Sequence, residues 1–293
     1  MSQSAILDIQ ALKARMKATW ESGDFGQVAK FIMEDAEQFM GPIDLQPGMN
    51  VLDAACGTGN LAILAARRGC ATSGLDIAAN LIAQARERAR KDSLKIEFTE
   101  GDAEAMPYPD ASFDVVVSMF GVMFAPRPER VVSELARVVK PGGLIAMANW
   151  APDGFIGKTF AVFGRHLPPR AEIPSPLLWG DEAVVRGRLT GMFERVRFKR
   201  RRARLCYPFN PAGTVDFLRR YYGPTHRAFE ALKPDGQAAL TRDLVELQTR
   251  HNISTIANET QTPSEYLETH AYRVGCSAPG ANQITVALPG SKT

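Results

Sequence analysis

The segment 51–60 (VLDAACGTGN) combines an apolar run, an acidic residue and a glycine-containing turn in front of a helical stretch. Gly57 and Gly59 let the backbone turn sharply and let a ligand approach where a β-carbon would clash. Backbone amides at the start of the following helix favour negative groups. The segment therefore predicts a loop that binds a small ligand through Gly57 and Gly59.

Acidic residues follow or end the first three apolar segments of the same region. Asp53 precedes Gly57, where its carboxylate suits an ammonium group and disfavours a pyrophosphate. Asp76 ends the next segment, where a carboxylate can accept both hydroxyls of a ribose. Asp102 follows the third segment, where it can accept from an adenine amino group. A ligand with an amine, a ribose and an adenine but no phosphate is S-adenosylmethionine.

Two other functions have to be weighed against this interpretation. Gly57, Gly59 and Ala62 also fit the G-x-G-x-x-G/A pattern of dinucleotide-binding loops, so an NAD(P)-dependent dehydrogenase is one alternative. The basic run at residues 195–204 suggests a nucleic-acid methyltransferase as the other. Alternate residues of a strand point to opposite faces, however, so we expect a charged edge strand there and regard a nucleic-acid partner as disfavoured.

The elements that must hold these acidic residues alternate between residues 48 and 150. Several predicted strands are apolar throughout, as in Val115-Val116-Val117, which is typical of parallel strands covered by helices on both faces. The alternation predicts an α/β, doubly wound fold. The predicted strands are 49–54, 71–76, 95–99, 115–119 and 144–148, and the predicted helices are 61–68, 81–91 and 129–138.

Further elements are predicted on either side of this region. Helical spacing of apolar residues predicts two helices within residues 6–40. Asp24 with Gln27 resembles a capping box that opens the second of them. After Trp150 the sequence predicts helices at 155–166, 214–222, 226–232 and 237–256, strands at 193–205 and 266–274, and a Ser-, Pro-, Gly- and Ala-rich tail from Cys276.

Four segments over residues 45–150 together resemble the class I S-adenosylmethionine-dependent methyltransferases. Within that family the sequence is most similar to the group that contains the ubiquinone and menaquinone biosynthesis methyltransferases. The family's first loop glycine is replaced by Ala55 here. The four segments are, in order, VLDAACGTGN, GLDIAANLIAQARERA, FTEGDAEAMPYPDASFDVVVSMFGVMF and LARVVKPGGLIAMANW.

The resemblance implies a seven-stranded, Rossmann-like methyltransferase sheet whose last strand is antiparallel, with helical lid insertions. It also implies S-adenosyl-L-methionine as the cofactor and transfer of its methyl group to an acceptor by in-line displacement. The implied cofactor-binding residues are Asp53, Ala55, Gly57 and Gly59 for the methionine part, Asp76 for the ribose, Ile77, Asp102 and Ala103 for the adenine, and Met119 beneath the ligand.

The parts of the chain outside the sheet motifs would have to build the acceptor site. We expect residues 1–40 to form an N-terminal helical lid and 208–262 a helical acceptor-pocket insert. Between them, 41–207 would form the cofactor-binding core, with an insert near 151–180. A closing strand at 263–275 and a tail at 276–293 complete the predicted organisation.

Tyr222 and His226 are the candidate catalytic residues of the acceptor site. They lie four positions apart and would share one face of a continuous helix, where they could contact an acceptor or move a proton. A helix junction with packed tyrosines and a solvent-facing histidine is the alternative, and His166 is a weaker candidate. Trp20 and Phe25 are the aromatic candidates from the lid, although core packing would also explain them.

Composition narrows the class of protein and its surroundings. The chain has 35 Lys and Arg against 32 Asp and Glu, a net charge of +3, which gives no reason to expect a nucleic-acid partner. Its four cysteines form no C-x-x-C pair, so neither a zinc site nor a disulfide framework is predicted, and a cytoplasmic location fits best. Neither a membrane span nor a secretory signal is predicted. We therefore expect a methyltransferase with a small-molecule acceptor, whose identity and methylated atom remain open, as does the oligomeric state.

Overall fold

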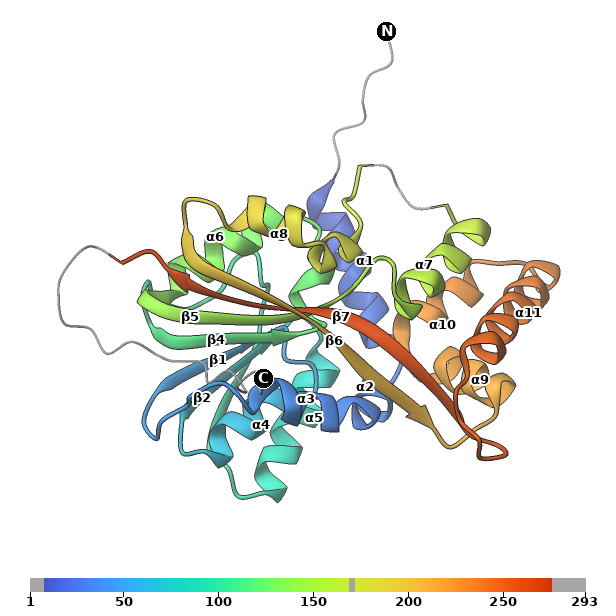
Figure 1. The fold of residues 1–293 in the computed structure, drawn as a ribbon, viewed down its shortest axis with the longest axis horizontal. Coiled ribbons are helices and arrows are strands. Elements are labelled where there is room, and N and C mark those ends of the chain that lie inside the picture. The colour runs from blue at the N-terminus through green and yellow to red at the C-terminus, as the bar shows by residue number, and fades with distance from the viewer. Residues whose placement is uncertain (1–7, 169–171, 276–293) are drawn as a thin grey trace, which may run out of the picture.

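The computed structural model describes residues 8–168 and 172–275. Seven strands form a single sheet (Figure 1), in which the last strand of the chain runs antiparallel to its neighbours and the other six strands run in one direction. The strands are β1 (Asn50–Ala54), β2 (Ala71–Asp76), β3 (Ile96–Glu100), β4 (Phe113–Met119), β5 (Val139–Trp150), β6 (Phe193–Tyr207) and β7 (Thr260–Arg273). Their order is β3-β2-β1-β4-β5-β7-β6, so the predicted seven-stranded methyltransferase sheet is confirmed.

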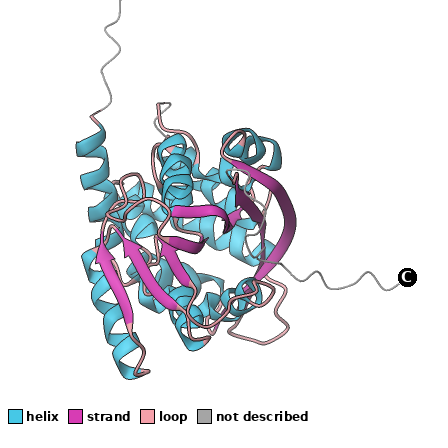
Figure 2. Ribbon diagram, turned by 90° about the vertical axis from the view of Figure 1, so that its left-hand side faces the viewer, coloured by secondary structure: helices cyan, strands magenta, loops and turns pink. Residues whose placement is uncertain are grey.

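Helices surround the strands, and Figure 2 shows them on both sides of the twisted sheet. α7 and α9 to α11 gather beyond the extended ends of β6 and β7 (Figure 1). None of the helices in the described part of the chain has the length and apolar character needed to cross a membrane. The helices are α1 (Ile9–Glu21), α2 (Phe25–Ala29), η1 (Lys30–Ile32), α3 (Met33–Met40), α4 (Asn60–Arg67), α5 (Ala79–Lys91), η2 (Val122–Phe124), α6 (Pro128–Val138), α7 (Phe155–His166), η3 (Pro176–Gly180), α8 (Glu182–Leu189), α9 (Pro211–Tyr221), α10 (Gly223–Glu230) and α11 (Pro234–His251).

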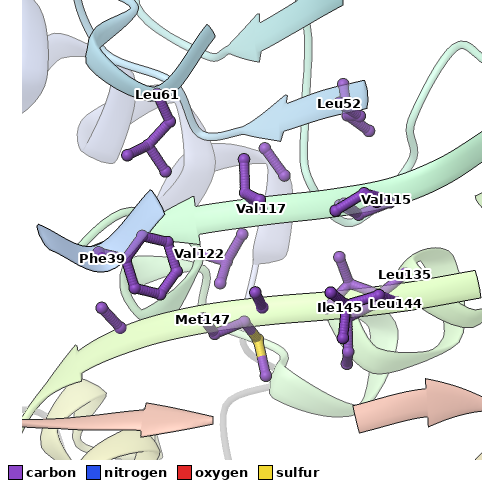
Figure 3. Packing of buried hydrophobic residues seen from close by; sticks show 14 of the residues in the cluster. Phe39, Leu52, Leu61, Val115, Val117, Val122, Leu135, Leu144, Ile145 and Met147 are labelled. Carbon is purple, nitrogen blue, oxygen red and sulfur yellow. The ribbon is translucent and has the colours of Figure 1, made fainter. Parts of the chain in front are cut away.

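The middle of the sheet is apolar on both faces, as its sequence predicts. Consecutive residues Val115, Val116 and Val117 of β4 are all buried, although their side chains alternate between the two faces. Figure 3 shows Phe39 of α3 among the packed side chains of the strands and Leu135 of α6 beside β5. Burial on both faces holds these central strands in place, so that the carboxyl ends of β1, β2 and β4 lie together at one end of the sheet.

The N-terminal forty residues divide into two parts with different packing. Phe39 and Met40 of α3 are 0% exposed and belong to the main hydrophobic core. A separable lid over the whole of residues 1–40 is therefore not what the structure contains, because removal of α3 would open the core. The lid interpretation remains for α1 and α2, which lie in front of α3 in the chain.

The second N-terminal helix is shorter than its sequence pattern predicts, and its N-cap residue, Asp24, does not make the contacts of the predicted capping box. α2 ends at Ala29 and is followed by η1 and α3. Asp24 does not cap α2 with its side chain. Its two carboxylate oxygens instead accept from the side-chain amides of Gln27 and Gln84, each at 3.0 Å. Asp24 thus joins α2 to α5 and does not complete the predicted capping box.

The C-terminal half differs from its predicted elements at two places. The helix predicted for 237–256 runs from Pro234 to His251 as α11. Asn252 ends it because its side-chain oxygen accepts from the backbone amides of Ser254 (3.0 Å) and Gln261 (2.8 Å), which turns the chain toward β7. α8 was not predicted, and the tail predicted at 276–293 lies outside the described residues.

Candidate active site

The glycine loop joins β1 to α4 through residues in the left-handed backbone region. Gly57 has φ = 53° and Gly59, the N-cap residue of α4, has φ = 81°. A β-carbon on Gly59 would lie 2.9 Å from the ring of Phe98, so glycine is required there for packing as well as for conformation. Ala55 adopts φ = 55° in the same loop, a conformation that disfavours an L-residue by ~1–2 kcal/mol relative to glycine. Ala55 therefore occupies a backbone conformation that glycine adopts more readily.

Asp53 is buried at the end of β1 and holds the start of α4. Its Oδ2 accepts from the backbone amide of Ala62 at 2.9 Å, in the first turn of that helix. Burial raises the pKa of the Asp53 carboxyl to about 7, and the neighbouring charge of Asp76 acts in the same direction. A cation placed beside Asp53 would favour the ionised carboxylate and lower that pKa.

Asp76 ties the end of β2 to the glycine loop. Its Oδ2 accepts from the amide of Gly57 at 2.8 Å, and its Oδ1 accepts from the amide of Ala78 at 2.9 Å. Burial raises the pKa of this carboxyl, while the two amides oppose that shift. Each carboxylate oxygen has acceptor capacity for more than one donor, so Asp76 can receive hydroxyl groups without giving up its backbone partners.

Asp102 follows β3 and is held by a lysine from the N-terminal helix. Its Oδ1 accepts from the amide of Glu104 at 2.8 Å, and its Oδ2 is paired with the Lys13 ammonium. Lys13 also lies 2.5 Å from a carboxylate oxygen of Glu104. Sequence reasoning did not find Lys13, because the residues it pairs with are distant in the chain and α1 has only a generic amphipathic pattern.

A cavity of about 1030 Å³ lies at the carboxyl ends of β1, β2 and β4, under α1 and α2. Of the predicted cofactor-binding residues, all but Gly59 line it. The lining at the sheet edge contains Asp53, Ala55, Gly57, Thr58, Asn60, Asp76, Ile77, Asp102, Ala103 and Met119, together with Lys13 from α1.

The opposite side of the cavity is formed by aromatic and aliphatic side chains. The indole of Trp20 contacts three other rings edge-on, with centroids 5.7 Å from Phe25, 5.1 Å from Phe124 and 5.9 Å from Tyr222. We call these four residues the aromatic roof. Such edge-to-face contacts fix ring orientation as well as burying apolar area. Further apolar lining comes from Met16 of α1 and Ile32 of η1, and from Phe120 and Val122 after β4.

Phe120 stands directly after β4 in a strained conformation. Its φ is 56°, which is a genuine outlier for a bulky residue, and its ring stacks on Trp150 at 3.5 Å. Next to it, a β-carbon on Gly121 would lie 2.4 Å from the carbonyl oxygen of Ala55. Both residues line the cavity. Such strain concentrates at binding sites, and only the positive φ, which a sequence does not reveal, marks Phe120.

The two predicted catalytic residues have different surroundings. Tyr222 belongs to the aromatic roof, behind Trp20 and Phe25, and burial raises the pKa of its hydroxyl. His226 lies outside the cavity lining, with its Nε2 3.2 Å from Glu230 and its Nδ1 3.2 Å from the carbonyl oxygen of Arg219. The amide of His226 donates to the carbonyl of Tyr222, so the two residues meet through the backbone in the first turn of α10.

The structure contains the helix junction at Tyr222 that was the alternative interpretation of the sequence, and it places the weaker candidate His166 away from the cavity. Pro224 occupies the first turn of α10 and does not break it, since α9 ends at Tyr221 and α10 begins at Gly223. His166 lies 2.9 Å from Asp243 of α11 and outside the cavity lining. Neither His166 nor His226 therefore shares a surface with the cofactor-binding loop.

The basic run on β6 is paired with acidic partners. Arg201 contacts Glu268 at 2.9 Å and Arg202 contacts Glu265 at 3.1 Å, both across the ladder to β7. Arg200 forms two hydrogen bonds with Asp153. β6 is one of the two edge strands of the sheet, as expected from its charges. These three arginines are therefore neutralised by acidic side chains and are less able to bind the phosphates of a nucleic acid.

Comparison with known proteins agrees with this geometry. The methyltransferase domain family matches residues 52–147, which carry the glycine loop, Asp76 and Asp102. A putative methyltransferase from Bacillus halodurans superposes with a TM-score of 0.57 at 18% identity, covering 82% of this chain and 99% of that one. The protein is thus a class I S-adenosylmethionine-dependent methyltransferase, and S-adenosylmethionine is its cofactor. The dehydrogenase and nucleic-acid alternatives receive no support.

Relatives found by sequence similarity define the family of the chain more narrowly than the fold does. It belongs to the same family as an uncharacterised protein of Mycobacterium tuberculosis, Rv1405c, to which it is 34% identical over 260 residues, 83% of this chain and 90% of that protein. It is also 36% identical over 123 residues to demethylmenaquinone methyltransferase of Thermus thermophilus, a match that covers 41% of this chain and 56% of the relative. The shared length with Rv1405c extends well beyond the methyltransferase domain into the flanking helices.

Proposed function

We propose that the acidic side of the cavity holds the cofactor through three carboxylates with separate tasks. Asp76 would accept the ribose hydroxyls, Asp102 the adenine amino group, and Asp53 would face the ammonium of the methionine part. All three line one cavity, and backbone amides already fix each carboxylate in position. Gly57 would leave room for close approach, because a β-carbon there would lie 3.5 Å from the ring of Phe25, which lines the cavity.

The buried carboxyl of Asp53 leads to a pH-dependent affinity. Because its pKa is about 7 in the ligand-free protein, Asp53 is mostly protonated at pH 6. A ligand ammonium favours the ionised form, so binding releases a proton and S-adenosylhomocysteine should bind about eightfold more tightly at pH 7.5 than at pH 6. Calorimetric titrations in buffers with different ionisation heats measure both the affinity and the proton release.

Asp53→Asn is the control for this pH dependence. Its side-chain oxygen can still accept from Ala62, but the group no longer titrates, so the affinity should vary little between the two pH values. In the ligand-free protein the sign is opposite: the raised pKa of Asp53 stabilises the fold at low pH, and that contribution is lost as the pH rises through about 7. Equal pH dependence in wild type and Asp53→Asn would remove Asp53 from the ammonium site.

We propose that the acceptor is an apolar small molecule, bound between the cofactor and the aromatic roof. The observation that carries this is the mixed lining of the cavity: the carboxylates come from the carboxyl ends of the strands, whereas the helical segments contribute the apolar side chains of Met16, Trp20, Phe25, Ile32 and Phe124. A charged acceptor group placed there would lose its hydration among apolar side chains. The name of the relative from Thermus thermophilus, a demethylmenaquinone methyltransferase, is compatible with such an acceptor.

The chain's own contribution to the reaction is orientation and exclusion of water. S-adenosylmethionine supplies a methyl group that is already activated on a sulfonium. Holding the acceptor in line with that methyl can contribute up to ~7–11 kcal/mol through orientation. In our proposal the aromatic roof does this by limiting where a flat or branched apolar acceptor can lie, and the apolar lining keeps water from competing. Tyr222 would support the roof from behind Trp20.

Transfer of a labelled methyl group to matched acceptors tests the proposed acceptor class. Neutral hydroxynaphthalenes are compared with their carboxylated or sulfonated analogues at saturating S-adenosylmethionine. We expect kcat/KM to be at least about tenfold higher for the neutral member of each pair, since the charged group would be desolvated without a partner. Equal or preferential use of the charged analogues would contradict an apolar acceptor site.

The remaining organisation is proposed on the same basis. α1 and α2 would form the lid, residues 41–207 with α3 the cofactor-binding core, and α9 to α11 with the 151–180 segment a support for the roof through Tyr222. We also propose a cytoplasmic location, which is supported by the free thiols of Cys56, Cys70 and Cys206.

A further inference from the structure

We infer that Lys13 of α1 is a positioning residue for the cofactor's adenine and determines the preference for adenine through Asp102. This inference rests on the proposed role of Asp102 as the acceptor of the adenine amino group. Lys13 lies outside the methyltransferase domain match at residues 52–147 and comes from the lid. A lid residue would thereby take part in recognising the cofactor's base.

The position of Lys13 joins the lid to the adenine side of the cavity. Its side chain is 12% exposed and lines the cavity, together with Met16 and Trp20 of the same helix. The ammonium contacts Asp102 and, at 2.5 Å, Glu104. Lys13 and Asp102 are 89 positions apart in the chain, so the pair exists only when α1 lies across the cavity.

The surrounding charges leave Asp102 dependent on Lys13. The side chain of Glu104 is fully buried, and Arg127 balances its charge through Nε at 2.7 Å and donates its backbone amide at 2.6 Å. The four side chains form a network of two carboxylates and two cations. Arg127 pairs with Glu104 and not with Asp102. Among the described residues, Lys13 is therefore the cation that contacts Asp102.

Lys13 and a backbone amide together fix the direction in which Asp102 can accept further hydrogen bonds. Oδ1 of Asp102 receives the amide of Glu104 at 2.8 Å and Oδ2 receives Lys13, so the carboxylate cannot rotate freely. The side chain remains 29% exposed and lines the cavity. An ionised carboxylate in fixed orientation attracts an amino group and repels a carbonyl oxygen at the same place. Adenine presents the amino group, whereas hypoxanthine presents the oxygen.

Lys17 is a matched comparison on the same helix. It lies one turn after Lys13 and pairs with Glu100, and its side chain is 35% exposed. Lys17 therefore helps α1 to dock beside β3 but does not line the cavity or contact Asp102. A difference between variants of the two lysines separates base recognition from docking of the helix.

The test compares S-adenosylhomocysteine with S-inosylhomocysteine, which carries a carbonyl oxygen in place of the adenine amino group. Dissociation constants are measured by calorimetry for wild type, Lys13→Met, Lys13→Gln and Lys17→Met. Wild type should prefer the adenine ligand by about a hundredfold or more, because a polar site built for one donor is left unpaired by the analogue. Both Lys13 variants should reduce this preference at least tenfold, whereas Lys17→Met should keep it within threefold.

The outcomes separate base recognition by Lys13 from the proposed function. A Lys13→Met protein that melts like wild type and weakens both ligands equally would overturn base recognition by Lys13 and leave only a role in holding the lid. Full retention of the preference in both Lys13 variants would overturn it as well. Asp102→Asn should also lose the preference, and if it does not, Asp102 itself is not the adenine acceptor. Failure of wild type to bind S-adenosylhomocysteine would instead contradict the cofactor site as a whole.

Discussion

Replacing Asp76 by asparagine should weaken S-adenosylhomocysteine binding by about a hundredfold. A hydrogen bond to a charged group contributes ~1.5–3 kcal/mol, and two ribose hydroxyls would share this carboxylate, so a loss of about 3 kcal/mol corresponds to that factor. The asparagine also carries an amide group that must face either the Gly57 or the Ala78 amide, both of which donate to Asp76. The glycine loop, which we propose contacts the cofactor, would lose one of its anchors.

Calorimetric titration of the ligand into both proteins measures this effect. Asp44→Asn is the matched control, because Asp44 is exposed and does not line the cavity. It removes the same charge and should bind S-adenosylhomocysteine as wild type does. An Asp76→Asn protein that retains the wild-type affinity within threefold would show that the ribose is held elsewhere.

The second large effect is expected for Trp20→Ala, through methyl transfer more than through cofactor affinity. The indole contacts Phe25, Phe124 and Tyr222, so its removal frees three rings of the aromatic roof at once. Misplacement of bound reactants by about 1 Å can lower a rate ~10²-fold, and we expect kcat/KM for the acceptor to fall by that order. Affinity for S-adenosylhomocysteine should change only a few-fold, since the carboxylates are untouched.

Trp20→Phe provides a graded comparison for this loss. A smaller ring at the same position keeps part of the edge-to-face contacts and should restore most of the transfer rate. Ile253→Ala, at an exposed position away from the cavity lining, should behave as wild type. Rates are measured with the best acceptor found among the hydroxynaphthalenes. If Trp20→Ala transfers methyl groups as fast as wild type, the roof does not orient the acceptor.

The grouping of most predicted cofactor-binding residues around one cavity follows from signals that are local in the sequence. Gly57, Gly59 and Asp76 lie in or directly after buried strands, and the carboxyl ends of parallel strands meet at one sheet edge. Their mutual contact follows from that topology. The Asp76 to Gly57 hydrogen bond at 2.8 Å is the physical link that sequence spacing anticipates.

The lid and the acceptor half could be predicted only in outline. Lys13 meets Asp102 through packing of α1 across the cavity, and neither residue's neighbours in the chain indicate the pair. The aromatic roof combines Trp20, Phe124 and Tyr222, which come from three segments that are distant in the chain. Helical periodicity indicates only the face of its own helix on which a residue lies, and not which residues of different segments meet. His226 is the converse case: its spacing from Tyr222 suggested a shared face, but its ring turns to Glu230 of its own helix.

A crystal structure of the protein with S-adenosylhomocysteine would test the division of the cavity into a cofactor side and an acceptor side. We expect the ribose hydroxyls to lie on Asp76, the adenine amino group on Asp102 beside Lys13, and the amino group of the homocysteine beside Asp53. The sulfur should point toward Trp20 and Phe124, so that a methyl group on it would face the aromatic roof. A ligand bound with its ribose away from Asp76, or with its sulfur turned from the roof, would contradict this division.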